Sequence, residues 1–162
     1  MSLEDYREAV SLISAHSDSA DFGGQRPAEL VERAEAALGV RFPPSYRAFV
    51  RELGAGDVAG EEFYGITSDE FVDSSIPNGI WLTLREREDS GLPEHLVIVY
   101  EDGEGDYYAV DTSKEGSEGE NPVVLWIPGA SQPDDDLEQV ADDFGTFFRA
   151  TVEEGLSRRG LI

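Results

Sequence analysis

Residues 40–66 read VRFPPSYRAFVRELGAGDVAGEEFYGI, and they carry the strongest structural signals in the chain. Proline suits the first helical position, where its missing backbone N–H costs nothing, so Pro44 should begin a short helix. Gly54 can adopt the left-handed conformation that ends a helix. Four apolar side chains recur between them at i, i+3, i+4 and i+7 and form one face: Tyr46, Phe49, Val50 and Leu53. Residues 61–66 then form a predicted strand.

Two further helices are predicted before this stretch. Residues 3–16 repeat apolar side chains at helical spacing, and we expect this helix to pack on the outside of the fold. Residues 18–25 carry polar side chains and paired glycines, which predict a loop. Pro27 opens the second helix and Gly39 ends it. This helix should form a tight pair with the helix that follows it.

One helix and three strands are predicted downstream. Asn78 is a favourable N-cap, and the charged continuation after it favours a helix as far as residue 89. Three apolar runs have the length of strands: Leu96–Tyr100, Tyr107–Asp111 and Val123–Ile127. Glycines 103 and 105 turn the first run back onto the second, which predicts a hairpin with an acidic tip.

The last predicted helix spans residues 135–152. Asp135 and Glu138 have the spacing of a capping box, and the acids around them complement the positive end of the helix dipole. One face stays apolar for four turns: Leu137, Val140, Ala141, Phe144, Phe147, Phe148, Thr151 and Val152. We expect the residues after this helix to be frayed.

Together these elements predict an α+β fold, with a mainly antiparallel sheet of about four to six strands and helices packed around it. A chain of 162 residues fits a single domain. We expect residues 1–26 to form an N-terminal helix and loop, 27–152 the core and 153–162 a tail. The side chains expected to be buried are Tyr46, Phe49, Val50, Leu53, Phe63, Ile66, Val97, Val99, Val123, Leu125, Phe144, Phe147 and Phe148.

The most informative feature of the composition is its acidity. The chain has 35 acidic and 12 basic residues, a net charge of −23. Such a surface repels nucleic acid and anionic membranes and attracts cationic partners. Acids gather between residues 101 and 120, whereas four arginines gather around the Pro-Pro segment: Arg33, Arg41, Arg47 and Arg51. Acidity also serves solubility or salt adaptation, so the composition alone leaves its purpose open.

The sequence also bears on location. It contains no cysteine, which excludes disulfides, a thiol nucleophile and a cysteine-based metal site. Residues 1–6 lack the basic and apolar segments of a signal peptide, and no apolar run approaches the length of a membrane span. We therefore expect a cytoplasmic protein.

Few residues suggest catalysis. His16 and His95 lie far apart, and neither has a neighbour at metal-ligand spacing. Asp102, Glu104 and Asp106 alternate like the start of a calcium loop, but a tyrosine stands at its sixth position and a serine at its twelfth. We therefore expect no catalytic residue, no cofactor and no dedicated metal site. The acidic hairpin tip is either a solvated turn or a place where a loop carries function.

In their order along the chain, these motifs resemble the SUKH superfamily, in particular its cell-wall-regulator (Smi/Knr) branch. The resemblance begins with LGVRFPPSYRAF, a Gly-x-Gly and EEFYGI within residues 38–66. It continues with GLPE at 91–94, DGEGDYY at 102–108, PVVLW at 122–126 and a closing helix with three phenylalanines. The resemblance covers roughly residues 27–152.

The resemblance implies a non-catalytic protein-binding domain. Bacterial proteins of this branch are similar to immunity proteins, which neutralise a cognate toxin domain that often acts on nucleic acid, so a basic toxin domain is the expected partner. Two alternatives stay open: a regulatory interaction hub, as in the fungal relatives, and a small carboxylate-based hydrolase, which a pocket with converging acids would favour. The oligomeric state is left open. The candidate partner-binding residues are Asp102, Glu104, Asp106, Glu115 and Glu118, with Glu61, Glu62 and Tyr64 as an alternative face.

Overall fold

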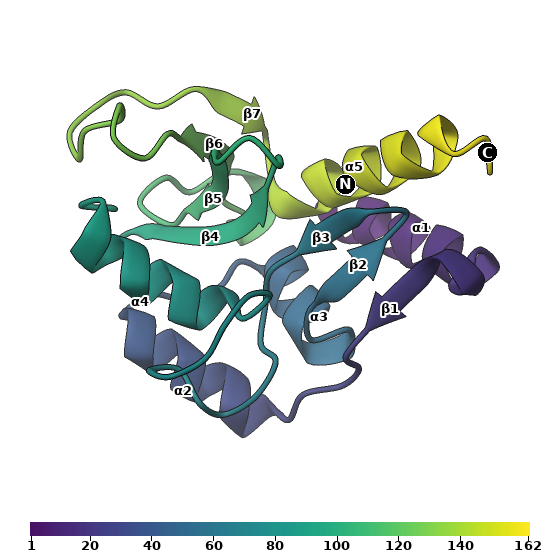
Figure 1. The fold of residues 1–162 in the computed structure, drawn as a ribbon, viewed down its shortest axis with the longest axis horizontal. Helices are drawn as coiled ribbons and strands as arrows, with labels where there is room; N and C mark the ends of the chain where they lie inside the picture. The colour runs from purple at the N-terminus through teal and green to yellow at the C-terminus, as the bar shows by residue number, and fades with distance from the viewer.

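The computed structural model describes residues 1–162 and confirms the α+β architecture (Figure 1). None of its helices is long and apolar enough to cross a membrane. There are five α-helices: α1 (Ser2–Ala15), α2 (Ala28–Leu38), α3 (Pro44–Glu52), α4 (Gly79–Asp89) and α5 (Phe144–Arg158). Two short 3₁₀ turns, η1 (Ser17–Ser19) and η2 (Ser117–Gly119), lie in connections.

One antiparallel sheet holds seven strands in the order β1 to β7, so each strand pairs with its neighbour in the chain. The strands are β1 (Ala20–Phe22), β2 (Gly56–Val58), β3 (Glu61–Phe63), β4 (Leu96–Glu101), β5 (Tyr107–Asp111), β6 (Val123–Trp126) and β7 (Gln139–Ala141). The count exceeds the expected four to six because β1, β2 and β7 were not predicted. Each of these three is only three residues long.

The helix predicted at Pro44 is confirmed as α3, and its apolar face lies in the core. Gly54 follows it with φ 74°, the left-handed conformation that its predicted role requires. The ring of Phe49 lies 6.3 Å from that of Phe63 in β3 and 5.3 Å from that of Phe148 in α5. Aromatic contacts at these distances therefore join helix, sheet and closing helix into one core.

The position of α1 differs from the expected one, because this helix is part of the core. Tyr6 is fully buried, and its ring lies 5.8 Å from that of Phe148. Its hydroxyl donates a hydrogen bond of 2.9 Å to Glu52 at the end of α3. Burial, and then the neighbouring Glu52, raise the pKa of Tyr6. Figure 1 shows α1 and α5 side by side, and contacts confirm that they pack together.

The expected strand at 61–66 is shorter in the structure, and two unpredicted strands lie beside it. β3 ends at Phe63 and forms a hairpin with β2, while β1 lies within the expected loop at 18–25. A Cβ atom on Gly56 would lie 2.2 Å from the backbone oxygen of Asp21, so only glycine lets these strands approach. Three-residue strands are too short for an alternating pattern to predict them.

The last helix was predicted to begin too early. It begins at Phe144, and residues 139–141 form β7, which pairs with β6. The N-cap is Asp143, whose carboxylate accepts a 2.8 Å hydrogen bond from the backbone N–H of Thr146. The apolar residues of β7 continue the helical spacing of α5 by coincidence, which is why the sequence pattern joined them.

The expected core is confirmed except at Leu53 and Leu125, which are only partly buried. The expected tail at 153–162 is helical as far as Arg158, and Leu156 within it is fully buried. The end of α5 therefore contributes to the core.

The loop after β5 is anchored by Glu120, whose buried carboxylate lies where α3 and α5 begin. Its oxygens accept hydrogen bonds from the backbone N–H (2.9 Å) and the hydroxyl (2.8 Å) of Ser45. The Ser45 hydroxyl accepts a 3.0 Å hydrogen bond from the backbone N–H of Gly145. Burial raises the pKa of Glu120, while its hydrogen bonds with Ser45 oppose this shift. This network fixes one end of the loop.

Candidate protein-binding surface

Three acidic side chains stand opposite one another on the first three strands. Asp21 of β1 is the register partner of Asp57 of β2, and Asp57 is the register partner of Glu62 of β3. Residues directly opposite each other on antiparallel strands place their side chains on the same face, about 5 Å apart. Like charges in this arrangement destabilise a sheet. The arrangement therefore costs folding stability.

Glu101 of β4 continues this line. Phe63 pairs with Tyr100, and Glu62 and Glu101 are the adjacent residues on the two strands. Because successive side chains of a strand point to opposite faces, both glutamates lie on the face away from the two aromatic rings. We call Asp21, Asp57, Glu62 and Glu101 the acid row.

The acid row is not neutralised by basic side chains. None of its four carboxylates forms an ion pair. Partial burial, then Asp57, then Glu101 raise the pKa of Glu62 above its ordinary value. The row thus produces a negative field on a sheet face whose strands lie in front of α1 and α3 in Figure 1.

The hairpin tip between β4 and β5 adds a second group of acids next to the row. The carboxylate of Asp102 accepts hydrogen bonds from the backbone N–H groups of Glu104 (2.9 Å) and Asp106 (3.4 Å). The carboxylate of Glu101 accepts a 3.0 Å hydrogen bond from Gly105, so this residue belongs to both groups. The tip is therefore ordered by its own acidic side chains.

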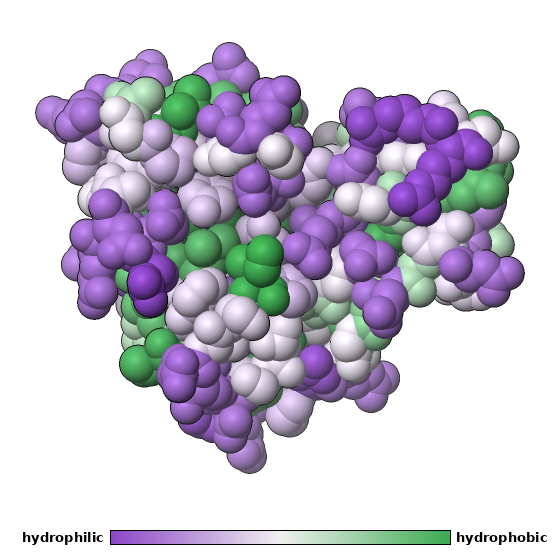
Figure 2. Space-filling view, viewed as in Figure 1, coloured by the Kyte–Doolittle hydropathy of each residue, from purple (hydrophilic) through white to green (hydrophobic).

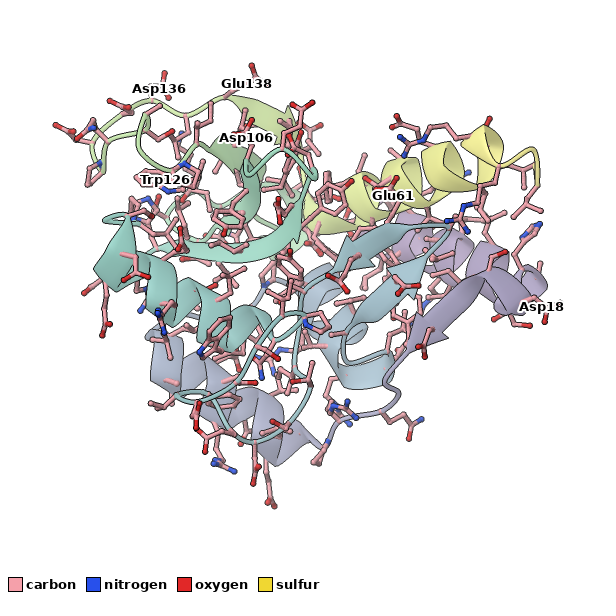
Figure 3. All side chains as sticks on the ribbon, viewed as in Figure 1. Asp18, Glu61, Asp106, Trp126, Asp136 and Glu138 are labelled. Carbon is pink, nitrogen blue, oxygen red and sulfur yellow. The ribbon has the colours of Figure 1, made fainter.

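Carboxylate oxygens of Asp102, Glu104 and Asp106 lie within 4.8 Å of one another. Exposed acidic groups often gather this way without a metal, and the tip lacks the glycine and the bidentate acid of a calcium loop. Glu138, before β7, extends the group: burial first, and then Asp102, Asp106 and Glu138, raise the pKa of Tyr108 beneath the tip. Figure 3 shows Asp106 and Glu138 at the same end of the molecule.

The other predicted acids of the loop after β5 do not join the tip. The tip precedes β5, whereas Glu115 and Glu118 follow β5. The five residues of this strand hold its two ends about 16 Å apart. Both glutamates are exposed. The structure thus divides the five predicted acids between two places.

Two members of the alternative face, Glu61 and Tyr64, are buried. Glu61 forms an ion pair with Arg158 of α5 and accepts a hydrogen bond from the hydroxyl of Tyr100, on the helix-covered side of the sheet (Figure 3). The hydroxyl of Tyr64 donates a 3.4 Å hydrogen bond to Glu101. Burial, followed by Glu101, raises the pKa of Tyr64. Of the three residues of this predicted face, only Glu62 is partly exposed.

Acids also converge on a hollow of about 440 Å³ near the N-terminus, as the hydrolase alternative would require. Its lining includes Glu115, Glu118, Glu120, Asp142 and Asp143. The two least exposed have structural partners: Glu120 binds Ser45, and Asp143 caps α5. The hollow has one hydrophobic residue in its lining, and the two serines that line it, Ser2 and Ser117, have no histidine beside them there. The geometry gives this alternative little support.

The histidines do not form a catalytic relay. Nε2 of His95 lies 3.7 Å from Oδ1 of Asp111, and the hydroxyl of Ser113 donates a 2.6 Å hydrogen bond to the same oxygen. In a nucleophilic triad the histidine would contact the hydroxyl, with the acid behind it. Here the serine is bound to the acid. His16 bonds only backbone oxygens of Leu12 and Leu161.

A small basic area lies on α3 and on the residues just before α2. A hollow of about 760 Å³ is lined by Arg26, Arg47, Arg51 and Glu52 among others. Arg26 donates hydrogen bonds to backbone oxygens of the neighbouring loops, and Arg47 is paired with Glu35. Arg26 and Arg47 thus hold parts of the fold together, whereas Arg51 is exposed and forms no ion pair.

The sequence matches the model of the SUKH_6 family, described as SMI1-KNR4 cell-wall, over residues 28–148. This match covers most of the chain, and the protein belongs to this family. Membership supports a non-catalytic interaction domain in general terms.

Proposed function

We propose that this protein is an immunity protein, which binds and neutralises a cognate toxin domain through the acid row and the hairpin tip. The observation that carries the proposal is that Asp21, Asp57 and Glu62 stand opposite one another in the sheet without a basic partner. Opposed like charges reduce the stability of the sheet, so the folded monomer gains nothing from them. A basic partner would neutralise them on binding.

The proposed toxin domain is basic and acts on nucleic acid. A cleft that binds phosphates is lined by basic groups, and an acidic protein can approach it rapidly and occlude it. A partner of this kind would face a rigid, negatively charged surface, since Glu62 and Glu101 lie on paired strands and the tip is fixed by its own hydrogen bonds. Cytoplasmic location follows from this proposal, because an immunity protein protects the cell that makes it.

The second candidate function is a regulatory interaction hub without a toxin. It rests on the same surface and the same family, so only the partner distinguishes the two. The gene beside this one is informative: a large secreted protein with a C-terminal toxin domain supports immunity, and its absence favours the hub.

The experiment is co-expression. The C-terminal domain of the neighbouring secreted protein is expressed alone and together with this chain, and survival of the host is counted. We expect death with the domain alone and survival with both. The double variant Asp57→Asn/Glu62→Gln tests the role of the acid row, and we expect it to protect less than the unchanged chain. Toxicity that this chain does not relieve would contradict the proposal, and binding without protection would favour the hub.

A further inference from the structure

An apolar patch is formed by the segment between β3 and α4 together with α4 itself. Val72 is 83% exposed, the largest exposure of any large hydrophobic side chain in the protein. It borders a hollow of about 240 Å³ together with Phe71, Trp81 and Leu84. Four of the six residues that line this hollow are hydrophobic, in contrast to the polar lining of the larger hollows. We call Phe71, Val72, Trp81 and Leu84 the apolar patch.

The loop that carries Val72 is fixed at its turn. The carboxylate of Glu70 accepts hydrogen bonds from the backbone N–H groups of Val72 (2.9 Å) and Asp73 (3.1 Å). These bonds lower the pKa of Glu70, so it is charged at neutral pH. The side-chain amide of the buried Asn78 donates to Thr67 (3.1 Å) and to the backbone oxygen of Glu70 (3.4 Å). Val72 is therefore exposed by an ordered turn.

The floor of the patch is fixed as well. Phe71 is buried against the main core, and Trp81 lies in the first turn of α4, which is capped by Asn78. The guanidinium of Arg85 lies 6.0 Å from the Trp81 ring and is also paired with Asp89. A preformed hollow of this kind binds a side chain without the cost of ordering its walls.

The charges at the rim are mainly negative. Glu70 and Asp73 flank Val72 in the turn, and Glu88 lines the hollow. The one basic residue at the hollow, Arg85, is already paired. Apolar contacts surrounded by charges of one sign fit a partner with the opposite pattern.

Figure 2 shows hydrophobic side chains reaching the surface among hydrophilic ones on this face of the molecule. The loop with Val72 crosses in front of α2 in the same view that shows β1, β2 and β3 in front of α1 and α3 (Figure 1). Val72 lies on the connection that leaves β3, and β3 carries Glu62 of the acid row.

We infer that the apolar patch is the anchor of the partner-binding face, and that it takes an aliphatic or aromatic side chain flanked by lysine or arginine on a basic protein. The inference rests on the proposed function, because the same partner supplies the charges for the acid row. The acids bring the partner to the surface, and the apolar contact slows its departure.

The test uses two synthetic peptides, acetyl-Lys-Lys-Leu-Phe-Lys-Lys-amide and a form with two serines in place of leucine and phenylalanine. Binding is followed by ¹H–¹⁵N spectra and by tryptophan fluorescence. Trp126 is fully buried, so a fluorescence change reports on the partly exposed Trp81. The variants are Val72→Ser and, as the matched control, Ile127→Ser, an exposed apolar residue elsewhere.

We expect the apolar peptide to shift the signals of Val72 and Trp81 and the serine form to leave them unchanged. Val72→Ser should raise the Kd of the apolar peptide about fivefold or more, whereas Ile127→Ser should not change it. Equal shifts by both peptides, confined to the acid row and the tip, would overturn the anchor and leave the proposed function standing. Absence of binding by either peptide would also overturn the anchor, while the co-expression experiment decides the proposed function independently.

Discussion

On the two faces of the sheet formed by β1 to β3, neighbouring acidic residues have opposite surroundings. On the helix-covered face, Glu61 is paired with Arg158 and hydrogen-bonded to Tyr100. On the open face, the next residue, Glu62, has no basic partner and stands opposite Asp57. The carboxylate on the covered face contributes to folding stability, whereas the opposed carboxylates on the open face reduce it. Charges that destabilise a fold require another explanation, and partner binding supplies one.

The largest expected effect lies on the covered face. Phe49→Ala should lower the free energy of unfolding by about 3–5 kcal/mol, because Phe49 is fully buried among five aromatic rings. Chemical denaturation measures the loss, with Ile127→Ala as an exposed control. A loss below about 1 kcal/mol, the range of surface changes, would show that this face is not the centre of the core.

A smaller loss is expected for Glu61→Gln, on the same face. The change removes a charge-assisted contact with Arg158 and weakens the hydrogen bond from Tyr100. Hydrogen bonds to charged groups contribute about 1.5–3 kcal/mol, and the exposed Arg158 side chain places the expected loss near the lower end. Denaturation of Glu154→Gln, an exposed acid of α5, provides the comparison. If Glu61→Gln left the free energy of unfolding unchanged, Glu61 would contribute no more to folding stability than Glu62, and the contrast between the two faces would be wrong.

On the open face the sign should reverse. Glu62→Gln relieves the repulsion from Asp57 and should raise the free energy of unfolding by about 0.2–1 kcal/mol at neutral pH. The folded-state pKa of Glu62 is raised. The folding stability that the protonated carboxyl contributes is therefore lost as the pH rises through that pKa. The advantage of the variant should therefore be small at about pH 4 and full at pH 7. An advantage that does not change with pH would contradict this explanation.

The smallest expected signal is an absence. In a gel-shift titration at physiological salt, the protein should not bind DNA or RNA, because its acidity opposes the counterion release that drives such binding. Arg51→Gln serves as a control for the basic area of α3. Tight, salt-sensitive binding that this variant abolishes would show that the basic area, and not the acid row, is the functional face.

Much of the fold could be predicted from the sequence where one signal was long or had a specific cause. Pro44 and Gly54 bracket α3 as predicted, and Asn78 caps α4 through the backbone N–H groups of Ile80 and Trp81. β1, β2 and β7 could not be predicted, because three residues contain at most one alternation. The start of α5 was wrong because the residues of β7 fit a helical spacing equally well.

The candidate surface was predictable only in part. Asp102, Glu104 and Asp106 alternate with glycines in one short turn, so their grouping follows from the sequence. Asp21, Asp57 and Glu101 were missed, since they come from three strands and only the register brings them to Glu62. A prediction of the β1–β2, β2–β3 and β3–β4 pairings would have revealed them. Local sequence offers no such signal.

The most direct measurement compares two double variants that remove the same charge. Asp57→Asn/Glu62→Gln alters the acid row, and Glu115→Gln/Glu118→Gln alters the loop at the other end of β5. Association of the toxin domain is measured for both by surface plasmon resonance over a range of salt concentrations. The proposal predicts a lower association rate and a weaker salt dependence for the acid-row variant, with higher folding stability, and a smaller change for the loop variant. Equal effects of the two variants, or a larger effect of the loop variant, would contradict the acid row as the binding face.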